Sequence, residues 1–157
     1  MMDFEKFLEL ARALRAQQVR YAFVGDVAMG AHGLLRATEH IDLFVASDTA
    51  NILKLRAALK SVWDDPEIEP ISADELSGDY PTIRYGSPDG LCFIDIISRL
   101  GTAFAFEDLE AEDMDLDGVS VSVATPRTLY RMKKGRLRPI DQADAAALRQ
   151  KFGLGEN

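Results

Sequence analysis

A short apolar segment that ends at a glycine limits what this chain can fold into. The run Tyr21-Ala22-Phe23-Val24 precedes Gly25, and the chain from Asp26 to about Leu34 has helical character. A short apolar run closed by glycine is typical of a buried strand, and Asp26 is a residue type that favours the N-cap of a helix. A second strand is predicted at 40–45, so this region predicts a strand–turn–helix–strand unit.

The glycines of this turn fit neither of two common phosphate-binding loops. The dinucleotide fingerprint needs glycine at position 27, which is Val27, and the P-loop needs lysine at position 31, which is Ala31. A helix that begins here would still direct backbone N–H groups toward a phosphate. Two interpretations stay open: a phosphate-binding turn, or a turn made by Gly25 with a helix capped by Asp26.

The rest of the chain predicts helices and hairpins within one domain, residues 1–157. Apolar residues recur at helical spacing over 3–16, near 52–62 and over 68–76. Turn signals at 87–90 and 117–118 predict hairpins between 80–85 and 91–97, and between 111–116 and 119–123. Thr125-Pro126 has the form of a helix start. The domain would therefore have an N-terminal helix within 1–19 and C-terminal helices within 125–152.

Composition narrows the classes of function. The chain has 157 residues and a formal net charge of −8, which argues against wrapping long nucleic acid. Cys92 is the only cysteine, no apolar run is long enough to span a bilayer, and no signal pattern opens the chain. A cytoplasmic location without membrane attachment is expected. Acidic residues crowd 107–117 and basic residues crowd 127–138, which suggests a localised site for a small anion.

One acidic motif imitates a calcium site. Asp113-x-Asp115-x-Asp117-Gly118 resembles the start of an EF-hand loop, but the twelfth position is Ala124, where that loop needs a bidentate Glu. Because Met114 and Leu116 alternate with the acids, a solvated edge strand is the better interpretation.

Two other acids lie in strands. Side chains alternate along a strand, so His40 and Asp42 share one face. Asp95 stands in the middle of Leu91–Ile97, the most apolar strand of the chain. An ionised carboxylate there needs a metal ion or a hydrogen-bond donor. Both options stay open at this point, and the candidate donors are Arg36, Arg84 and Arg99.

In order, these residues resemble a known family. They are similar to the motifs of minimal nucleotidyltransferase domains of the DNA polymerase β-like superfamily. The matching segments are Val24-Gly25, a short helix with His32-Gly33, Arg36-x-Thr38-x-His40-Ile41-Asp42-Leu43, and Ile94-Asp95-Ile96. Bacterial AbiEii-type and stand-alone nucleotidyltransferase-like proteins are the most similar in this respect. The C-terminal pattern Thr125-Pro126-x-x-Leu129-x-x-Met132-Lys133, then Arg138-Pro139-x-Asp141-x-x-Asp144, also resembles that family. The resemblance covers roughly residues 20–150.

The resemblance implies a fold, a reaction and a set of site residues. The fold would be a mixed β-sheet flanked by helices, of class α/β (α+β). The reaction would be a metal-dependent transfer of an NMP from an NTP to a hydroxyl of a protein, an RNA or a small molecule. Mg²⁺ or Mn²⁺ would be the cofactor. The implied catalytic and metal-binding residues are Asp42 and Asp95, with His40 as a third metal ligand. The implied nucleotide-binding residues are Gly25, Asp26, Arg36, Thr38 and Lys133.

Two residues depart from the family pattern. Asp26 replaces a small residue of the turn and places negative charge where a triphosphate would lie, and His40 replaces the first Asp of an Asp-x-Asp pair. Magnesium prefers oxygen ligands, so both changes oppose Mg-NTP chemistry. Either Asp26 reaches the metal and His40 binds a softer ion such as manganese or zinc, or the site is degenerate. A degenerate domain would bind a nucleotide or a protein partner, as in a toxin–antitoxin pair.

Two further groups of residues receive a structural interpretation. His32, one residue before Gly33, is expected to support the fold. Arg138, Asp141 and Asp144 are expected to form a local ion-pair network, or to hold the last helix against the site.

Overall fold

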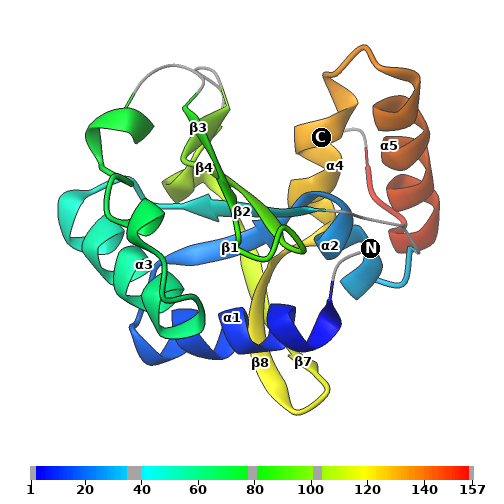
Figure 1. Cartoon of the computed structure of the whole chain (residues 1–157). Coiled ribbons are helices and arrows are strands. Elements are labelled where there is room, and N and C mark those ends of the chain that lie inside the picture. The colour runs from blue at the N-terminus through cyan, green and yellow to red at the C-terminus, as the bar shows by residue number, and fades with distance from the viewer. Residues whose placement is uncertain (1–2, 35–39, 78–80, 101–103, 156–157) are drawn as a thin grey trace.

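A computed structural model describes residues 3–34, 40–77, 81–100 and 104–155. Within these ranges the chain forms a mixed six-stranded sheet, in the order β3-β4-β2-β1-β8-β7, together with five α-helices (Figure 1). The helices are α1 (Phe4–Ala16), α2 (Gly25–Ala31), α3 (Thr49–Val62), α4 (Pro126–Lys134) and α5 (Pro139–Phe152). The strands of the sheet are β1 (Tyr21–Val24), β2 (His40–Val45), β3 (Thr82–Gly86), β4 (Phe93–Ile97), β7 (Ala111–Leu116) and β8 (Val119–Ala124).

The sheet mixes parallel and antiparallel pairs. β1 runs antiparallel to β2 and parallel to β8, while β2 runs parallel to β4. The two predicted hairpins form the edges, β3 with β4 and β7 with β8. The predicted fold class, a mixed sheet flanked by helices, is confirmed.

The helices form two groups around the sheet (Figure 1). α1 packs against α3 and β8, and α4 packs against α5. The short helix α2 contacts β1, β2 and α4, so it lies between the sheet and the C-terminal helices. Strand β1, at the centre of the sheet, is buried along its whole length, which agrees with its uniformly apolar sequence. This arrangement brings the end of β1, the start of α2 and the helix α4 close to one another.

Local sequence signals explain several of the element boundaries. Asp117 (φ 53°) and Gly118 (φ 82°) form the turn between β7 and β8, because Asp and Gly tolerate the left-handed region that a tight hairpin needs. The Thr125 side chain accepts a hydrogen bond from the Thr128 N–H and caps α4, with Pro126 as the first helical residue. β7 is an edge strand, and its acidic side chains are exposed, as predicted.

The structure corrects three expectations. Asp26 is not an N-cap: Val24 holds that position without a side-chain hydrogen bond, and Asp26 lies in the first turn of α2. Residues 68–76 are not one helix: the region instead holds 3-10 turns at Pro66–Ile68 and Asp74–Leu76. A small antiparallel pair, β5 (Arg99–Leu100) with β6 (Phe104–Ala105), was not predicted.

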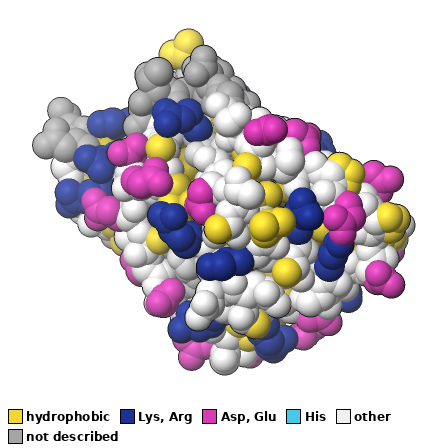
Figure 2. All heavy atoms as spheres, turned by 90° about the vertical axis from the view of Figure 1, so that its left-hand side faces the viewer, with side chains coloured by type: hydrophobic (Ala, Val, Ile, Leu, Met, Phe, Trp, Pro, Cys, Tyr) yellow, Lys and Arg dark blue, Asp and Glu magenta, His cyan; other side chains and the backbone are white. Residues whose placement is uncertain are grey.

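On the α3 side of the molecule, the described residues form no concentrated patch of one charge or of hydrophobic side chains. Figure 2 shows acidic and basic side chains interspersed over this face, with hydrophobic side chains scattered among them. Among the helices described, none is long and apolar enough to cross a membrane. Of the two charged runs noted in the sequence, the acidic one continues along the exposed edge strand β7, whereas Lys133, Arg136 and Arg138 of the basic one line a pocket between the sheet and the C-terminal helices.

Candidate metal and nucleotide site

The register between β2 and β4 brings the two predicted carboxylates together. In this parallel pair Asp42 is the partner of Asp95, and His40 is the partner of Phe93. Partners in register point to the same face of a sheet, and residues two apart on one strand do so as well. His40, Asp42 and Asp95 therefore share one face, which the sequence predicted for His40 and Asp42 by strand alternation.

The three side chains form a compact cluster. One ligand atom of each lies within 4.8 Å of the others. The His40 Nε2 atom is 3.4 Å from Asp42 Oδ1 and 3.7 Å from Asp95 Oδ2. These separations are long for hydrogen bonds, whereas two ligands of one metal ion, each at about 2.1 Å from it, lie roughly 3.0–3.5 Å apart when adjacent. The 3.4 Å separation lies in that range and the 3.7 Å separation above it, so the cluster would hold one metal ion, with one nitrogen and two oxygen ligands, once its side chains move closer together.

Asp95 also has an arginine partner. Arg84 on β3 lies opposite Asp95 in the antiparallel register, and its Nε and Nη2 atoms donate to the two carboxylate oxygens at 2.7 and 3.0 Å. Arg84 is one of the three arginines that the sequence offered as donors, and Arg36 lies outside the described residues. The Arg84 side chain is 64% exposed, whereas that of Asp95 is 13% exposed. Arg84 therefore covers the carboxylate from the solvent side, and both interpretations of Asp95 remain compatible with the geometry.

Asp42 is under electrostatic strain. The pKa of its carboxyl is raised from 3.8 to about 6, above all by burial; the charges of Asp95 and Asp26 contribute to the rise, and those of His40 and Lys133 oppose it. A carboxylate held this way gains from any cation placed beside it. The surroundings of Asp42 therefore favour a bound metal ion.

Gly25 makes room for Asp42. A Cβ atom at position 25 would lie 2.0 Å from Asp42 Oδ2, and the residue has φ of +66°. Both observations require glycine here, because side chains rarely adopt this φ and none would fit. The glycine that closes β1 thus serves the close approach of the Asp42 carboxylate to the backbone.

The C-terminal helices supply the opposite wall. Lys133 on α4 donates to Asp144 at 2.7 Å and to Asp141 at 3.5 Å, and both acids, on α5, are almost fully buried. Arg138 donates through Nε and Nη2 to Asp141 at 2.7 and 3.2 Å. The hydrogen bonds from Arg138, above all, lower the pKa of Asp141. This is the predicted ion-pair network, and it also binds α4 to α5.

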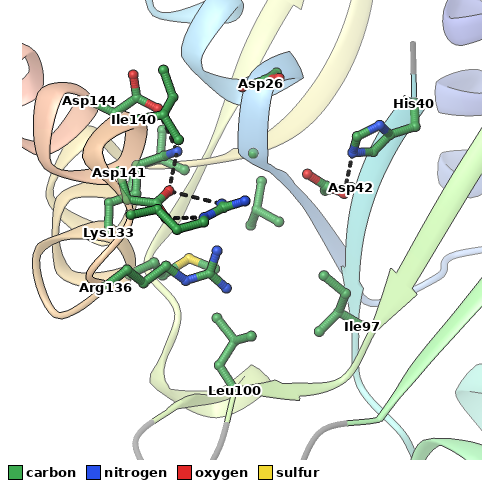
Figure 3. Close-up of a pocket in the computed structure, with 15 residues that line it drawn as sticks. Asp26, His40, Asp42, Ile97, Leu100, Lys133, Arg136, Ile140, Asp141 and Asp144 are labelled. Atoms are coloured by element: carbon green, nitrogen blue, oxygen red, sulfur yellow. Dashed lines mark hydrogen bonds and ion pairs between the residues drawn. The ribbon is translucent and has the colours of Figure 1, made fainter. Parts of the chain in front are cut away.

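A pocket of about 340 Å³ lies between these two walls (Figure 3). On the sheet side it is lined by Gly25, Asp26, His40 and Asp42, and on the helix side by Lys133, Arg136, Arg138, Asp141 and Asp144. Its remaining lining is apolar and comprises Val24, Ile97, Leu100, Leu129, Met132 and Ile140. The pocket thus joins an acidic wall on the sheet side, a wall of three cations and two acids on the helix side, and a hydrophobic surface.

Most of the predicted site residues meet in this region. Gly25, Asp26, His40, Asp42 and Lys133 line the pocket, and Asp95 joins it through the cluster. Arg36 and Thr38 lie outside the described residues. His32 is buried, its Nε2 atom lies 2.8 Å from the Ala124 carbonyl oxygen, and its ring packs edge-on against Phe152, so its predicted structural role is confirmed.

The sequence did not single out Arg136 or the apolar lining as parts of a site. In the sequence Arg136 is one member of the basic cluster at 127–138. Its place in the pocket becomes visible only once α5 folds back onto α4. The apolar lining residues follow the same spacing as core residues. No signal in the sequence alone distinguishes them from the core.

Solved structures share this fold over nearly the whole chain. A provisionally assigned nucleotidyltransferase of Thermotoga maritima, TM1012, superposes with a TM-score of 0.55 at 12% identity, over 98% of this chain and 96% of that one. An antigenic nucleotidyltransferase-like protein of Paracoccidioides brasiliensis superposes with a TM-score of 0.55 at 17% identity, over 93% of this chain and 75% of that one. ANT(2″)-Ia, in complex with adenylyl-2″-tobramycin, superposes with a TM-score of 0.57 at 10% identity, over 96% of this chain and 91% of that one.

The chain therefore has a nucleotidyltransferase-like fold. No protein-family model matches the chain, and no curated protein matches it in sequence. The narrower AbiEii-type assignment stays a prediction.

Proposed function

We propose that this protein is a metal-dependent nucleotidyltransferase that works with manganese in preference to magnesium. The observation that carries the proposal is the register of Asp42 beside Asp95, with His40 Nε2 between their carboxylates, at the pocket beside Gly25. A set of one imidazole and two carboxylates suits Mn²⁺ or Zn²⁺ better than Mg²⁺, which prefers oxygen alone. When bound, such an ion would supply a positive charge that offsets the charge of a phosphoryl group during transfer.

The residues of the chain would divide the remaining work between the two walls. Asp42 and Asp95 would hold the ion, and His40 would complete the set. The Arg84 guanidinium must loosen its grip on Asp95 for that carboxylate to bind the ion fully. The exposure of the Arg84 side chain permits such a movement.

The acceptor would be a hydroxyl group, as expected for nucleotidyl transfer. ANT(2″)-Ia in its solved structure is in complex with adenylyl-2″-tobramycin, which supports a small-molecule acceptor. A protein or an RNA acceptor is a prediction from the family resemblance. The part of the pocket lined by Ile97, Leu100 and Met132 offers an apolar surface to a nucleobase or to an acceptor.

The second candidate is a protein that binds a nucleotide without transferring it. The pairing of Asp95 with Arg84 favours it, because a carboxylate engaged at both oxygens is a weaker metal ligand. The charge of Asp26 in the first turn of α2 favours it as well, since it would repel a phosphate. A toxin–antitoxin partner and a bacterial setting belong to this proposal as predictions from the family resemblance, and a cytoplasmic location as the prediction from cysteine content and composition.

The test is a transfer assay with α-labelled NTPs and separate pools of protein, RNA and small-molecule hydroxyls. We expect transfer with Mn²⁺ that exceeds transfer with Mg²⁺ and is lost in Asp42→Asn, while the exposed Asp113→Asn variant retains it. Asp26→Gly combined with His40→Asp is expected to raise the Mg²⁺ reaction. Strong Mg²⁺ activity in the unmodified chain would contradict the role given to His40. NTP binding without transfer in both the unmodified chain and the double variant would favour the second candidate.

A further inference from the structure

We propose that Arg136 is the residue on the helix side of the pocket that binds the phosphate chain of the nucleotide. The inference rests on the proposed function for the identity of the ligand. Three cationic side chains line that wall: Lys133, Arg136 and Arg138. They differ in how far their charges are already neutralised.

Two of the three cations are committed to buried acids. Lys133 has a side chain only 12% exposed and donates to Asp144 and Asp141. Arg138 directs both its Nε and its Nη2 atoms at Asp141. These two cations and two carboxylates have no net charge together. A phosphate that recruited Lys133 or Arg138 would compete with their hydrogen bonds to buried carboxylates, which is costly.

Arg136 has no such commitment. Among the residues that the structure describes, no ion pair or side-chain hydrogen bond joins its guanidinium to another group, and it influences Asp141 through charge alone, after Arg138 and Lys133. Figure 3 shows the Arg136 side chain extending from the segment between α4 and α5 into the pocket. Its guanidinium can offer paired N–H donors to phosphate oxygens, a geometry that suits arginine better than lysine.

The backbone of Arg136 is fixed although its side chain is available. Its N–H donates to the Lys133 carbonyl at 3.0 Å, and its carbonyl accepts a hydrogen bond from the Gln142 side chain. The residue is therefore anchored to both C-terminal helices, which limits the entropy lost when the side chain binds a ligand.

The opposite wall explains why this contact would matter. Asp26 and Asp42 place negative charge on the sheet side of the pocket. An anion entering without a metal ion meets repulsion there, so the attraction must come from the helix side. Binding of a triphosphate is thus expected to need Arg136 and to strengthen when Mn²⁺ occupies the cluster.

The test measures binding by calorimetry with inorganic tripolyphosphate and with ATP, each with and without Mn²⁺, on the full chain. We expect Arg136→Gln to weaken both ligands about ten- to hundred-fold, which is the ordinary worth of a charge-assisted hydrogen bond to phosphate. Arg136→Lys should recover part of the loss. Arg127→Gln removes the same charge from an exposed position of α4 outside the pocket and should bind as the unmodified protein does.

The outcomes separate this inference from the proposed function. Binding of both probes by Arg136→Gln within twofold of the unmodified protein would overturn the role of Arg136, whatever the transfer assay shows. A loss for ATP but not for tripolyphosphate would also overturn it, because the contact would then be to the nucleoside. An unmodified chain that binds neither probe would overturn it too. Loss of tripolyphosphate binding in a protein that transfers no nucleotide would support Arg136 and contradict the proposed transfer.

Discussion

Replacing Asp42 with asparagine tests whether the acidic cluster is strained in the absence of metal. Burial, above all, raises the pKa of Asp42 from 3.8 to about 6. Between those pH values the folded chain keeps a proton that the unfolded chain has released. The folded state therefore binds more protons, and its free energy of unfolding falls as the pH rises through this window. The stability from this group is fully present below about pH 4 and is lost above about pH 6.

The size of the effect follows from the same shift. A rise of roughly two pH units, at about 1.4 kcal/mol for each, gives about 3 kcal/mol at neutral pH, as an upper figure for a side chain that is 22% exposed and coupled to its neighbours. Asp42→Asn removes the titration, so we expect the variant to be more stable than the unmodified chain at pH 8 and no more stable at pH 4. In a domain of this size each kcal/mol shifts Tm by about 2–4 °C.

The assay is urea unfolding at pH 4 and pH 8, with and without Mn²⁺. Mn²⁺ should stabilise the unmodified chain at pH 8 and leave Asp42→Asn unchanged, because only the folded carboxylate cluster binds the ion. Asp113→Asn, on the exposed edge strand, should change stability by less than about 0.5 kcal/mol at either pH. A loss of stability in Asp42→Asn that is equal at both pH values would refute the reasoning, since it would make Asp42 a structural carboxylate and not a strained one.

Three further substitutions test single contacts. Gly25→Ala should destabilise the chain by about 1–2 kcal/mol or more, because the left-handed backbone resists a side chain. It should also abolish the stabilisation by Mn²⁺, because the methyl group displaces Asp42. Thermal unfolding with Mn²⁺ checks both effects, and unchanged metal binding would contradict the close approach of Asp42 to Gly25. Arg84→Gln should tighten Mn²⁺ binding several-fold by releasing Asp95, as measured by calorimetry, whereas weaker binding would mean that Arg84 orients the carboxylate for the ion. Thr125→Ala should cost about 1 kcal/mol in urea unfolding through the lost cap of α4, and a change below about 0.3 kcal/mol would show that Pro126 alone fixes the helix start.

The elements and turns that depend on local sequence were predictable. Asp117-Gly118 defines its hairpin, and Thr125-Pro126 defines the start of α4, because both signals act within a few residues. The shared face of His40 and Asp42 follows from strand alternation alone. The failure at Asp26 is also local in origin: Gly25 adopts positive φ to admit Asp42, and this shifts the helix start by two residues from the expected cap.

The contacts that depend on strand pairing were not predictable. The sequence offered three arginines as hydrogen-bond donors to Asp95, namely Arg36, Arg84 and Arg99. The antiparallel register of β3 with β4 places Arg84 directly opposite that carboxylate. That register is fixed by the whole hairpin and not by any property of Arg84. The separate status of Arg136 is of the same kind, because it emerges only once α5 places two buried acids beside Lys133 and Arg138.

The two departures from the family pattern act on the same carboxylate. Asp26 raises the pKa of Asp42, although less than burial does, and His40 lowers it. Three carboxylates therefore act at this point, those of Asp26, Asp42 and Asp95. A chain with Gly at position 26 and Asp at position 40 would also have three. The departures thus move one carboxylate from the strand to the first turn of α2 without changing the number of carboxylates at the cluster. On this view the double variant Asp26→Gly with His40→Asp tests the placement of charge and not its amount. A gain in Mg²⁺-dependent transfer would then be due to the oxygen ligand at position 40 and to the opening of the turn to phosphate.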